Sequence, residues 1–515
     1  MLIEAAEYEI IIVGAGSAGS VLASRLTEQA GHSVLLLEAG HEPAAGSAAA
    51  RRVADGFSLQ ASTDSETARI NSVELMRGRQ AQAHSGKVLG GSSAVNGGYF
   101  IRGTSQDVER LTAASSGLWS EEEVLGAYCR SEHDLDFAVE PDHGSCGPIP
   151  VQRDTEPLHP VSSSFAQACS AMGYQSEPDK NSLSEPGIGP VPLNISNGVR
   201  VNAAGAYLQP NRNRSNLSIL TGCEVQRVVI EHGRAVGVQV VDARGSRLIR
   251  SQQVVLCAGA LSSAQLLLLS GVGPGQALRG LGIEVHSDVS GVGSATTNHP
   301  TLDLMYEPVP AVQVSESSSF MQMALHCGSG SESGSGEADL EFMPTRRPYG
   351  QVTGVDPADR LLSIRITLML PRSRGTLRLS SSDPQDQPVS IYNYLQETSD
   401  RERMRAAVRT AVALAESPEF SPLVEQLFGP DPAELASDAQ LDAWIAERLG
   451  TAFHLMGGCP MGPASDPTAV VDARCQVYGI EGLRVVDTSI LPGPLSRGPA
   501  ATAIMIGELA AKNFG

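Results

Sequence analysis

Residues 9–19 read EIIIVGAGSAG, an apolar run that passes directly into a glycine-rich turn. An amphipathic stretch with helical spacing follows at residues 20–29, and a second apolar run at residues 33–37 ends at Glu38. The order of strand, glycine turn, helix and strand predicts a βαβ unit that binds a dinucleotide.

Each glycine of this turn meets a backbone requirement of such a site. Gly14 allows the tight turn, Gly16 lets the backbone approach a pyrophosphate, and Gly19 lets the helix pack on the strand. The helix N-terminus offers free N–H groups and a positive dipole end to phosphates. Ser17 and Ala18, which lie within the glycine motif, are also expected to contact the cofactor.

Glu38 completes the pattern. It lies 24 residues after Gly14, close to the separation of about 20 that places an acidic residue on a ribose hydroxyl. We therefore expect a Rossmann-type site for FAD. NAD and a ligand-free glycine turn remain alternatives on this segment alone.

Composition narrows the class of protein. The 515 residues allow two to four domains, at about 100–200 residues per domain. The net charge of -20 argues against nucleic acid and anionic membranes as partners. We see no basic leader and no apolar run long enough to span a bilayer, so we expect a cytoplasmic protein. The eight cysteines form no C-x-x-C pair, and we expect reduced thiols rather than a metal site.

Periodicity outlines the rest of the chain. We expect further strands at 216–241, 253–258 and 483–487, and helices at 118–132, 261–269, 401–415, 438–449 and 503–512. Residues 41–70 lack a period and predict a surface loop. Within residues 311–338, the Gly- and Ser-rich segment 327–336 predicts a flexible loop by its composition. For Asp339 and Glu341 we expect a solvated loop, with a position facing the substrate as the alternative.

Longer motifs extend over nearly the whole chain. Residues 86–103 read GKVLGGSSAVNGGYFIRG, residues 259–273 read GALSSAQLLLLSGVG, and residues 453–462 read FHLMGGCPMG. Together these segments resemble the glucose-methanol-choline (GMC) oxidoreductases. Ala264 stands where that family usually has Pro or Ser.

The resemblance implies FAD and a split α/β architecture: a Rossmann-type FAD-binding domain with an inserted α+β substrate domain. The FAD domain would comprise residues 1–155, 200–300 and 450–515. The substrate domain would comprise residues 156–199 and 301–449.

The resemblance also places residues around the cofactor. Val88, Asn96 and Gly97 are expected near the flavin ring, Val225 at the adenine through its backbone, and Asp487 at the pyrophosphate or ribityl region. Ala500 is also expected to contact the cofactor. Some relatives attach FAD through a His just before the motif Asn, but Val95 stands there, so we expect non-covalent FAD.

His454 lies in the segment that carries the family's catalytic histidine. Histidine suits a general base because its pKa lies near working pH. His454 would take a hydroxyl proton while the carbon gives hydride to flavin N5. His299, the other histidine in a family-like motif, is expected to be structural or to lie at the domain junction.

A second catalytic His or Asn is missing. In residues 497–501, RGPAA, Gly498 stands at its usual position and Ala500 at a common following Asn. Arg497 or a residue of the substrate domain is a candidate replacement. The low aromatic content of 4% does not favour an aromatic sugar platform.

The leading hypothesis is an FAD-dependent oxidation of a small-molecule alcohol, with oxygen, a quinone or a protein as electron acceptor. The alternative is a flavoenzyme of the same fold with altered or non-redox chemistry, such as a lyase or a biosynthetic tailoring step. A flavin-binding protein without catalysis is the third hypothesis.

Overall fold

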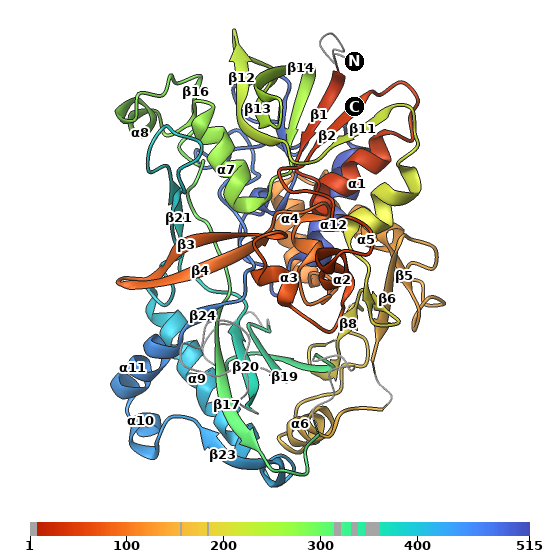
Figure 1. The fold of residues 1–515 in the computed structure, drawn as a ribbon. Helices are drawn as coiled ribbons and strands as arrows, with labels where there is room; N and C mark the ends of the chain where they lie inside the picture. The colour runs from red at the N-terminus through yellow and green to blue at the C-terminus, as the bar shows by residue number, and fades with distance from the viewer. Residues whose placement is uncertain are drawn as a thin grey trace.

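The computed structural model describes residues 8–154, 157–182, 185–313, 321–330, 338–345 and 361–514. Its described apolar side chains gather into two large cores, one around each of two seven-stranded sheets. In Figure 1 the sheet with β1, β2 and β14 lies in the upper half, and the sheet with β17, β19 and β20 lies in the lower half.

The first sheet has the order β11-β2-β1-β14-β13-β12, with β25 beside β14. Its strands are β1 (Tyr8–Val13), β2 (Val34–Leu37), β11 (Leu217–Leu220), β12 (Glu224–Glu231), β13 (Arg234–Asp242), β14 (Gly245–Leu256) and β25 (Leu483–Val485). The pairings among β11, β2, β1, β14 and β25 are parallel, whereas β12, β13 and β14 pair antiparallel. This is the parallel sheet that the βαβ unit predicts, assembled from three distant parts of the chain.

Twelve α-helices occur in the described residues. They are α1 (Ser17–Leu26), α2 (Ala48–Ala54), α3 (Gln60–Thr63), α4 (Ser105–Ala114), α5 (Glu121–Ser131), α6 (Pro160–Ala171), α7 (Gly259–Leu269), α8 (Gly275–Gly280), α9 (Thr398–Glu416), α10 (Pro432–Ala436), α11 (Asp438–Arg448) and α12 (Ala500–Lys512). Helices α1 and α12 approach closely, because a Cβ on Gly507 would lie 2.8 Å from the Ala18 carbonyl oxygen. The last helix of the chain thus covers the first.

The second sheet has the order β23-β17-β20-β19-β18-β7, with β24 beside β17, and its pairings are antiparallel. Its strands are β7 (Ile188–Pro190), β17 (Pro300–Pro308), β18 (Met323–Cys327), β19 (Leu340–Thr345), β20 (Leu362–Leu368), β23 (Val424–Phe428) and β24 (Gly450–Thr451). Helix α9 buries an apolar stripe, including Met404, Val408 and Val412, in the same core as β17 and β20.

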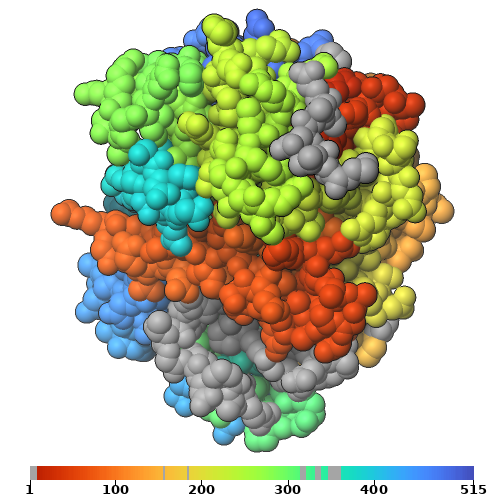
Figure 2. All heavy atoms as spheres, turned by 45° about the horizontal axis from the view of Figure 1, so that its top comes forward, coloured from red at the N-terminus to blue at the C-terminus, as the bar shows by residue number. Residues whose placement is uncertain are grey.

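A long hairpin lies between the two halves. It consists of β3 (Ala68–Met76) and β4 (Arg79–Gly86), and β3 also pairs with β22 (Val389–Ile391), which pairs with β21 (Thr376–Arg378). Figure 2 shows the orange hairpin region as a band across the molecule between the two halves. A smaller sheet joins β5 (Glu132–Asp134), β6 (Ile149–Arg153) and β8 (Pro192–Leu193).

The expected elements between 216 and 269, at 118–132, at 401–449 and at the C-terminus are all present, with boundaries that differ by a few residues. The split Rossmann-type and α+β architecture is confirmed, while the domain boundaries remain a prediction.

One loop prediction was wrong. Residues 41–70 contain α2 and α3 and the start of β3, and α2 begins because the Ser47 side chain accepts a hydrogen bond from the Ala50 N–H. In the other predicted loop, at residues 327–336, Cys327 is the last residue of β18 and residues 328–330 form no helix or strand. Residues 314–320 and 331–337 lie outside the described residues.

Candidate functional site

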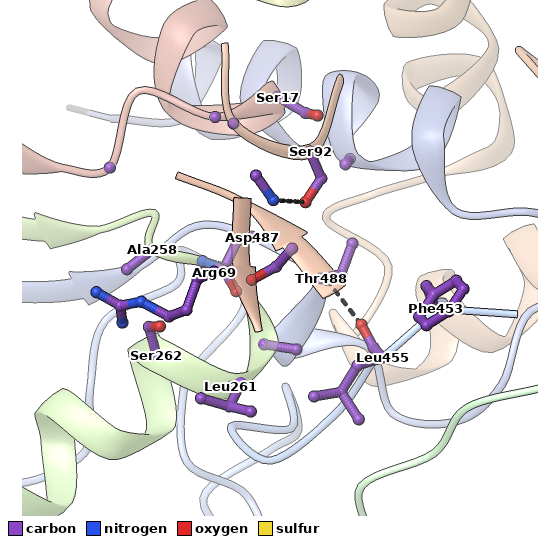
Figure 3. Close-up of a pocket in the computed structure, with 18 of the residues that line it drawn as sticks. Ser17, Arg69, Ser92, Ala258, Leu261, Ser262, Phe453, Leu455, Asp487 and Thr488 are labelled. Atoms are coloured by element: carbon purple, nitrogen blue, oxygen red, sulfur yellow. Dashed lines mark hydrogen bonds between the residues drawn. The ribbon is translucent and has the colours of Figure 1, made fainter. Parts of the chain in front are cut away.

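An elongated cavity of about 390 Å³ runs from the glycine turn of β1 and α1 to the face of the second sheet. Figure 3 shows how side chains from separate segments surround it: Ser17 from α1, Ser92 from residues 86–97, Leu261 and Ser262 from α7, and Asp487, Thr488, Phe453 and Leu455 from the C-terminal part. The cavity therefore lies where the motifs of the sequence converge.

The glycine turn brings backbone close to this cavity. Gly14 has φ +104°, and a Cβ there would lie 2.4 Å from the Cys257 carbonyl oxygen. A Cβ on Gly91, from the second glycine-rich segment, would lie 2.6 Å from the Gly16 Cα. Helix α1 begins after Gly16 with no side chain capping its N–H groups. These free N–H groups can donate to a pyrophosphate, which can approach closely because the neighbouring glycines carry no side chains.

Glu38 lies at the end of β2, as the motif predicts. Its Oε2 accepts a hydrogen bond from the Ala15 N–H at 2.9 Å, and its Oε1 accepts one from the Gly40 N–H at 2.8 Å. Burial raises the pKa of this carboxyl above its ordinary value. The carboxyl group is thus fixed beside the cavity, with lone pairs that can still accept from a ribose hydroxyl.

Asp487 joins two segments beside the cavity. Its Oδ2 accepts hydrogen bonds from the Gly259 N–H at 2.9 Å and the Ser263 hydroxyl at 2.5 Å, and its Oδ1 accepts one from the Ser489 N–H at 2.8 Å. The side chain therefore fixes the start of α7 against the C-terminal segment. Its predicted contact with the cofactor stays a prediction.

Most of the predicted site residues line this one cavity. They are Gly14, Gly16, Ser17, Ala18, Glu38, Asn96, Gly97, Val225, His454, Asp487 and Ala500. Gly19 does not line it but serves packing, because a Cβ there would lie 1.9 Å from the Gly14 carbonyl oxygen. Val88 does not line it either. Its side chain is fully buried in a small core with Val53, Ala61, Ala94 and Val95.

His454 is placed by pairing between two distant segments. The N–H groups of Met456 and Thr297 each donate to the other residue's carbonyl at 2.9 Å. The Asn298 Oδ1 accepts from the N–H groups of both His299 and His454 at 2.8 Å. Phe453, just before His454, holds φ +61°, a left-handed conformation that is uncommon for a bulky residue and recurs at functional sites.

The same pairing brings His299 against His454. The two Nδ1 atoms lie 2.9 Å apart, and the His299 Nε2 lies 3.0 Å from the Leu495 carbonyl oxygen. The prediction that His299 is structural or lies at a domain junction missed this contact. Its partner is 155 residues away in the sequence, and no local pattern joins the two.

The hydrogen bonds fix the tautomers of both rings. A carbonyl oxygen only accepts, so the His299 Nε2 carries a proton and donates to Leu495. The His299 Nδ1 of a neutral ring is then an acceptor, and the His454 Nδ1–H donates to it. The His454 Nε2 is consequently left with a free lone pair.

Burial keeps both rings neutral. It lowers the pKa of His299 to about 4 and, together with the charge of a protonated His299, lowers the pKa of His454 to about 3. The unprotonated Nε2 of His454 is thus available as a base over the ordinary pH range.

Gly498 lies directly beside His454. A Cβ at Gly498 would be 3.5 Å from Cε1 and 3.7 Å from Nε2 of His454, which is ordinary van der Waals contact. The position of the missing second residue is therefore adjacent to His454. Arg497 does not line the cavity, and its guanidinium lies 3.8 Å from the Glu177 carboxylate.

Strands β19 and β20 form the wall at the His454 end of the cavity. Glu341 and Met343 of β19 pair with Thr367 and Arg365 of β20, and all four line the cavity. Glu341 is 3% exposed. The prediction of a solvated loop at Asp339 and Glu341 was wrong, because both residues are buried and Glu341 lies within a strand of the second sheet.

A buried charged cluster lies apart from the cavity-lining residues. Glu132, Asp134 and His143 have ligand-type atoms within 4.8 Å of one another. Arg102 donates to Glu132 at 2.5 Å and Arg153 to Asp134 at 2.7 Å. Burial opposes the charge on His143, but its carboxylate partners raise the pKa to about 11. Cations of the chain itself therefore already neutralise these carboxylates.

Comparisons with known proteins agree with this geometry. Two family models described as GMC oxidoreductase match residues 8–301 and 371–507. The chain belongs to the GMC oxidoreductase family. It is an FAD-dependent oxidoreductase, and its relatives support alcohol-type oxidation in general.

Relatives match over almost their full length. A GMC-type oxidoreductase from the thcA 5′ region of Rhodococcus erythropolis is 37% identical, with 98% of each chain covered. An oxygen-dependent choline dehydrogenase of Brucella anthropi is 31% identical, covering 99% of this chain and 95% of that one. The solved structure of a pyridoxine 4-oxidase from Mesorbium loti is similar at a TM-score of 0.91 and 30% identity, with 99% of both chains covered.

Within the described residues, none of the helices combines the length and apolar character needed to cross a membrane. The eight cysteines are unpaired in the structure, and their reduced state stays a prediction.

Proposed function

We propose that the protein oxidises the CH–OH group of a small-molecule alcohol, with His454 taking the hydroxyl proton. The observation that carries this proposal is the 2.9 Å contact between the Nδ1 atoms of His454 and His299. The Nδ1–H of His454 is held by His299, and its unprotonated Nε2 lies beside Gly498 at the cavity.

The residues present fit FAD as a non-covalent cofactor. The N–H groups at the start of α1, with Ser17 and Ala18, would hold the pyrophosphate, and Glu38 would hold the ribose. Asn96, Gly97 and Ala500 would lie near the flavin ring, and Val95 offers no atom for a covalent link. When bound, FAD supplies the hydride acceptor at N5.

The chain then contributes orientation and proton transfer. His454 Nε2 accepts the hydroxyl proton, and His299 continues to accept the Nδ1–H of the ring, which keeps the imidazole from rotating. The Leu495 carbonyl, at the far end of this pair, favours positive charge that develops on the rings. The buried wall of β19 and β20 excludes water at the same end of the cavity.

A second candidate function is altered or non-redox chemistry on the same fold. The observation in its favour is that Gly498 and Ala500, at the cavity, present no hydrogen-bonding side chain. Under this hypothesis FAD is retained without net transfer of hydride from an alcohol.

The anaerobic visible spectrum of the purified protein, before and after a panel of small alcohols, separates the two. Bleaching of the flavin bands by any alcohol at a rate competent for turnover supports oxidation. Unchanged bands across the panel, in folded protein whose flavin dithionite still reduces, favour the second candidate. Once an alcohol has reduced the flavin, oxygen, a quinone or a protein acceptor is added in separate experiments. The compound that restores the flavin bands is the electron acceptor.

A further inference from the structure

Glu341 combines burial with an oxygen that no protein group satisfies. Its Oε2 accepts from the Tyr99 hydroxyl at 3.2 Å and from the His326 Nε2–H at 2.9 Å. Its Oε1 has no hydrogen-bond partner among the described residues, and the residue lines the cavity that holds His454. The residue is only 3% exposed, yet this oxygen is not among the fully buried polar atoms that lack a partner, so it is accessible at the cavity. A ligand in the cavity can therefore donate to it, which relieves the cost of a poorly solvated acceptor.

The carboxyl group is held in its ionised form. Burial opposes ionisation, but the hydrogen bond from His326, the charges of His326 and His454 in their protonated forms and the charge of Arg497 outweigh it and lower the pKa of Glu341 to about 2. The side chain is therefore an anion across the ordinary pH range.

The direct partners of this anion are neutral donors. Burial and the nearby charges of Arg497 and Lys180 lower the pKa of His326. The Lys180 Nζ donates to the His326 Nδ1 at 3.2 Å, so the neutral ring carries its proton on Nε2 and donates it to Glu341. Tyr99 donates through an uncharged hydroxyl.

The neighbouring cations contact other carboxylates. Lys180 lies 2.5 Å from Glu177, and Arg497 lies 3.8 Å from the same residue. Arg365, on the cavity wall, is bound to Asp303 of β17 at 3.0 Å. Among these groups none of the full positive charges contacts Glu341 directly.

We propose that Glu341 is a recognition residue for a protonated primary or secondary amine carried by the alcohol substrate. An ammonium group supplies both the positive charge and the N–H donor that Oε1 lacks. A quaternary ammonium has charge but no N–H, and an anionic substrate is repelled. This inference rests on the proposed oxidation for the position of the hydroxyl group at His454.

The test compares amino alcohols with neutral alcohols of equal length. Linear ω-amino alcohols of increasing chain length are paired with the 1-alkanols in which a methyl group replaces the ammonium. Anaerobic flavin reduction gives kcat/KM for each member. At the chain length that spans from His454 to Glu341, the amino alcohol is expected to exceed its alkanol by at least about tenfold. Its N-trimethyl derivative is expected to fall below the primary amine.

The matched variants are Glu341→Gln and Glu307→Gln. Gln keeps the shape of the side chain but removes the charge, so the preference for amino alcohols should vanish through a higher KM while alkanol oxidation is little changed. Glu307 lies on β17 of the same sheet but is exposed, so its variant should retain the full preference.

Binding of linear alkylamines tests the site without turnover. These compounds lack the hydroxyl, and their binding is followed as a perturbation of the flavin spectrum of the holoenzyme. Wild type should bind alkylamines more tightly than equal-length alkanols, and Glu341→Gln should not. This result stands even if no alcohol reduces the flavin, so it separates the inference from the oxidation itself.

The proposal is overturned if wild type treats each amine and its neutral counterpart alike in both measurements, or if Glu341→Gln keeps the preference. Should Glu341→Gln fail to fold, the wild-type comparisons and a second variant, Glu341→Asp, decide. Asp keeps the charge on a shorter side chain, so this variant should still prefer an amine to its neutral counterpart, but one with a longer chain.

Discussion

The two ends of the cavity are built in different ways. At one end, the glycine turn between β1 and α1 consists of consecutive residues whose backbone geometry requires glycine, as Gly14 at φ +104° shows. At the other end, the wall at His454 is assembled from residues far apart in the sequence, such as Glu341 paired across strands with Thr367.

The two ends differ in how far apart in the sequence the residues that form them lie. The cofactor end depends on local backbone requirements that are visible in a short motif. The substrate end depends on strand register and on contacts between remote segments, such as the His299–His454 pair. The first end is expected to tolerate no local change, and the second is expected to set rate and specificity.

The largest effect is expected at the glycine turn. Gly14→Ala places a Cβ 2.4 Å from the Cys257 carbonyl oxygen, and the left-handed conformation adds about 1–3 kcal/mol of strain. The purified variant should lose FAD or fail to fold, as measured by its flavin absorbance and Tm. Gly31→Ala, whose Cβ would meet nothing within 4 Å, is the control. A Gly14→Ala protein with full flavin content would refute the role given to this turn.

At the other end, His299→Ala removes the acceptor of the His454 Nδ1–H. The ring can then rotate or change tautomer, so anaerobic flavin reduction should slow by about ten- to a hundredfold with flavin content retained. Water entering the space should also raise the pKa of His454, which moves the acidic limb of the pH profile upward. A slower variant with an unshifted profile would indicate a purely structural role for His299.

The pH profile of wild type tests the state of the base. His454 acts when unprotonated, and its pKa is lowered from 6.5 to about 3. Activity is therefore kept as pH falls through 6.5 and is lost only as pH approaches the lowered value. The kcat/KM for flavin reduction should stay level down to about pH 5, since the unperturbed group would already be protonated there. An acidic limb near pH 6.5 would contradict the burial argument.

The smallest effect is expected at Gly498. An Asn side chain starts at ordinary contact distance from His454, so Gly498→Asn should fold with a stability change within about 1 kcal/mol. Flavin reduction should change by less than about tenfold, because His299 already orients the base. A gain of a hundredfold would instead show that the absent side chain limits oxidation and would favour altered chemistry in the native protein.

Much of the fold follows from the sequence because its signals are local. A clear hydrophobic periodicity is present in the βαβ unit, in the strands of residues 216–258 and in the last helix. The glycine motif of residues 14–19 in addition indicates that a dinucleotide binds there. The helix α2 was missed because Ala-rich and charged residues show no clear apolar period, although Ser47 is a recognisable cap.

The parts that were missed depend on tertiary contacts. In the sequence alone, Glu341 has the character of a polar loop residue. Its burial results from the pairing of β19 with β18 and β20. The relation of His299 to His454 requires the pairing of Thr297 with Met456. Each of these contacts joins residues from different segments, so a pattern within one segment cannot reveal it.

The central claim is that His454 removes the substrate proton. Its most direct test is the anaerobic rate of flavin reduction by the best alcohol substrate, at saturation, in wild type and in His454→Ala with matched flavin content. The account predicts a loss of at least about a hundredfold with an unchanged flavin spectrum. Reduction of the variant at the wild-type rate would contradict it.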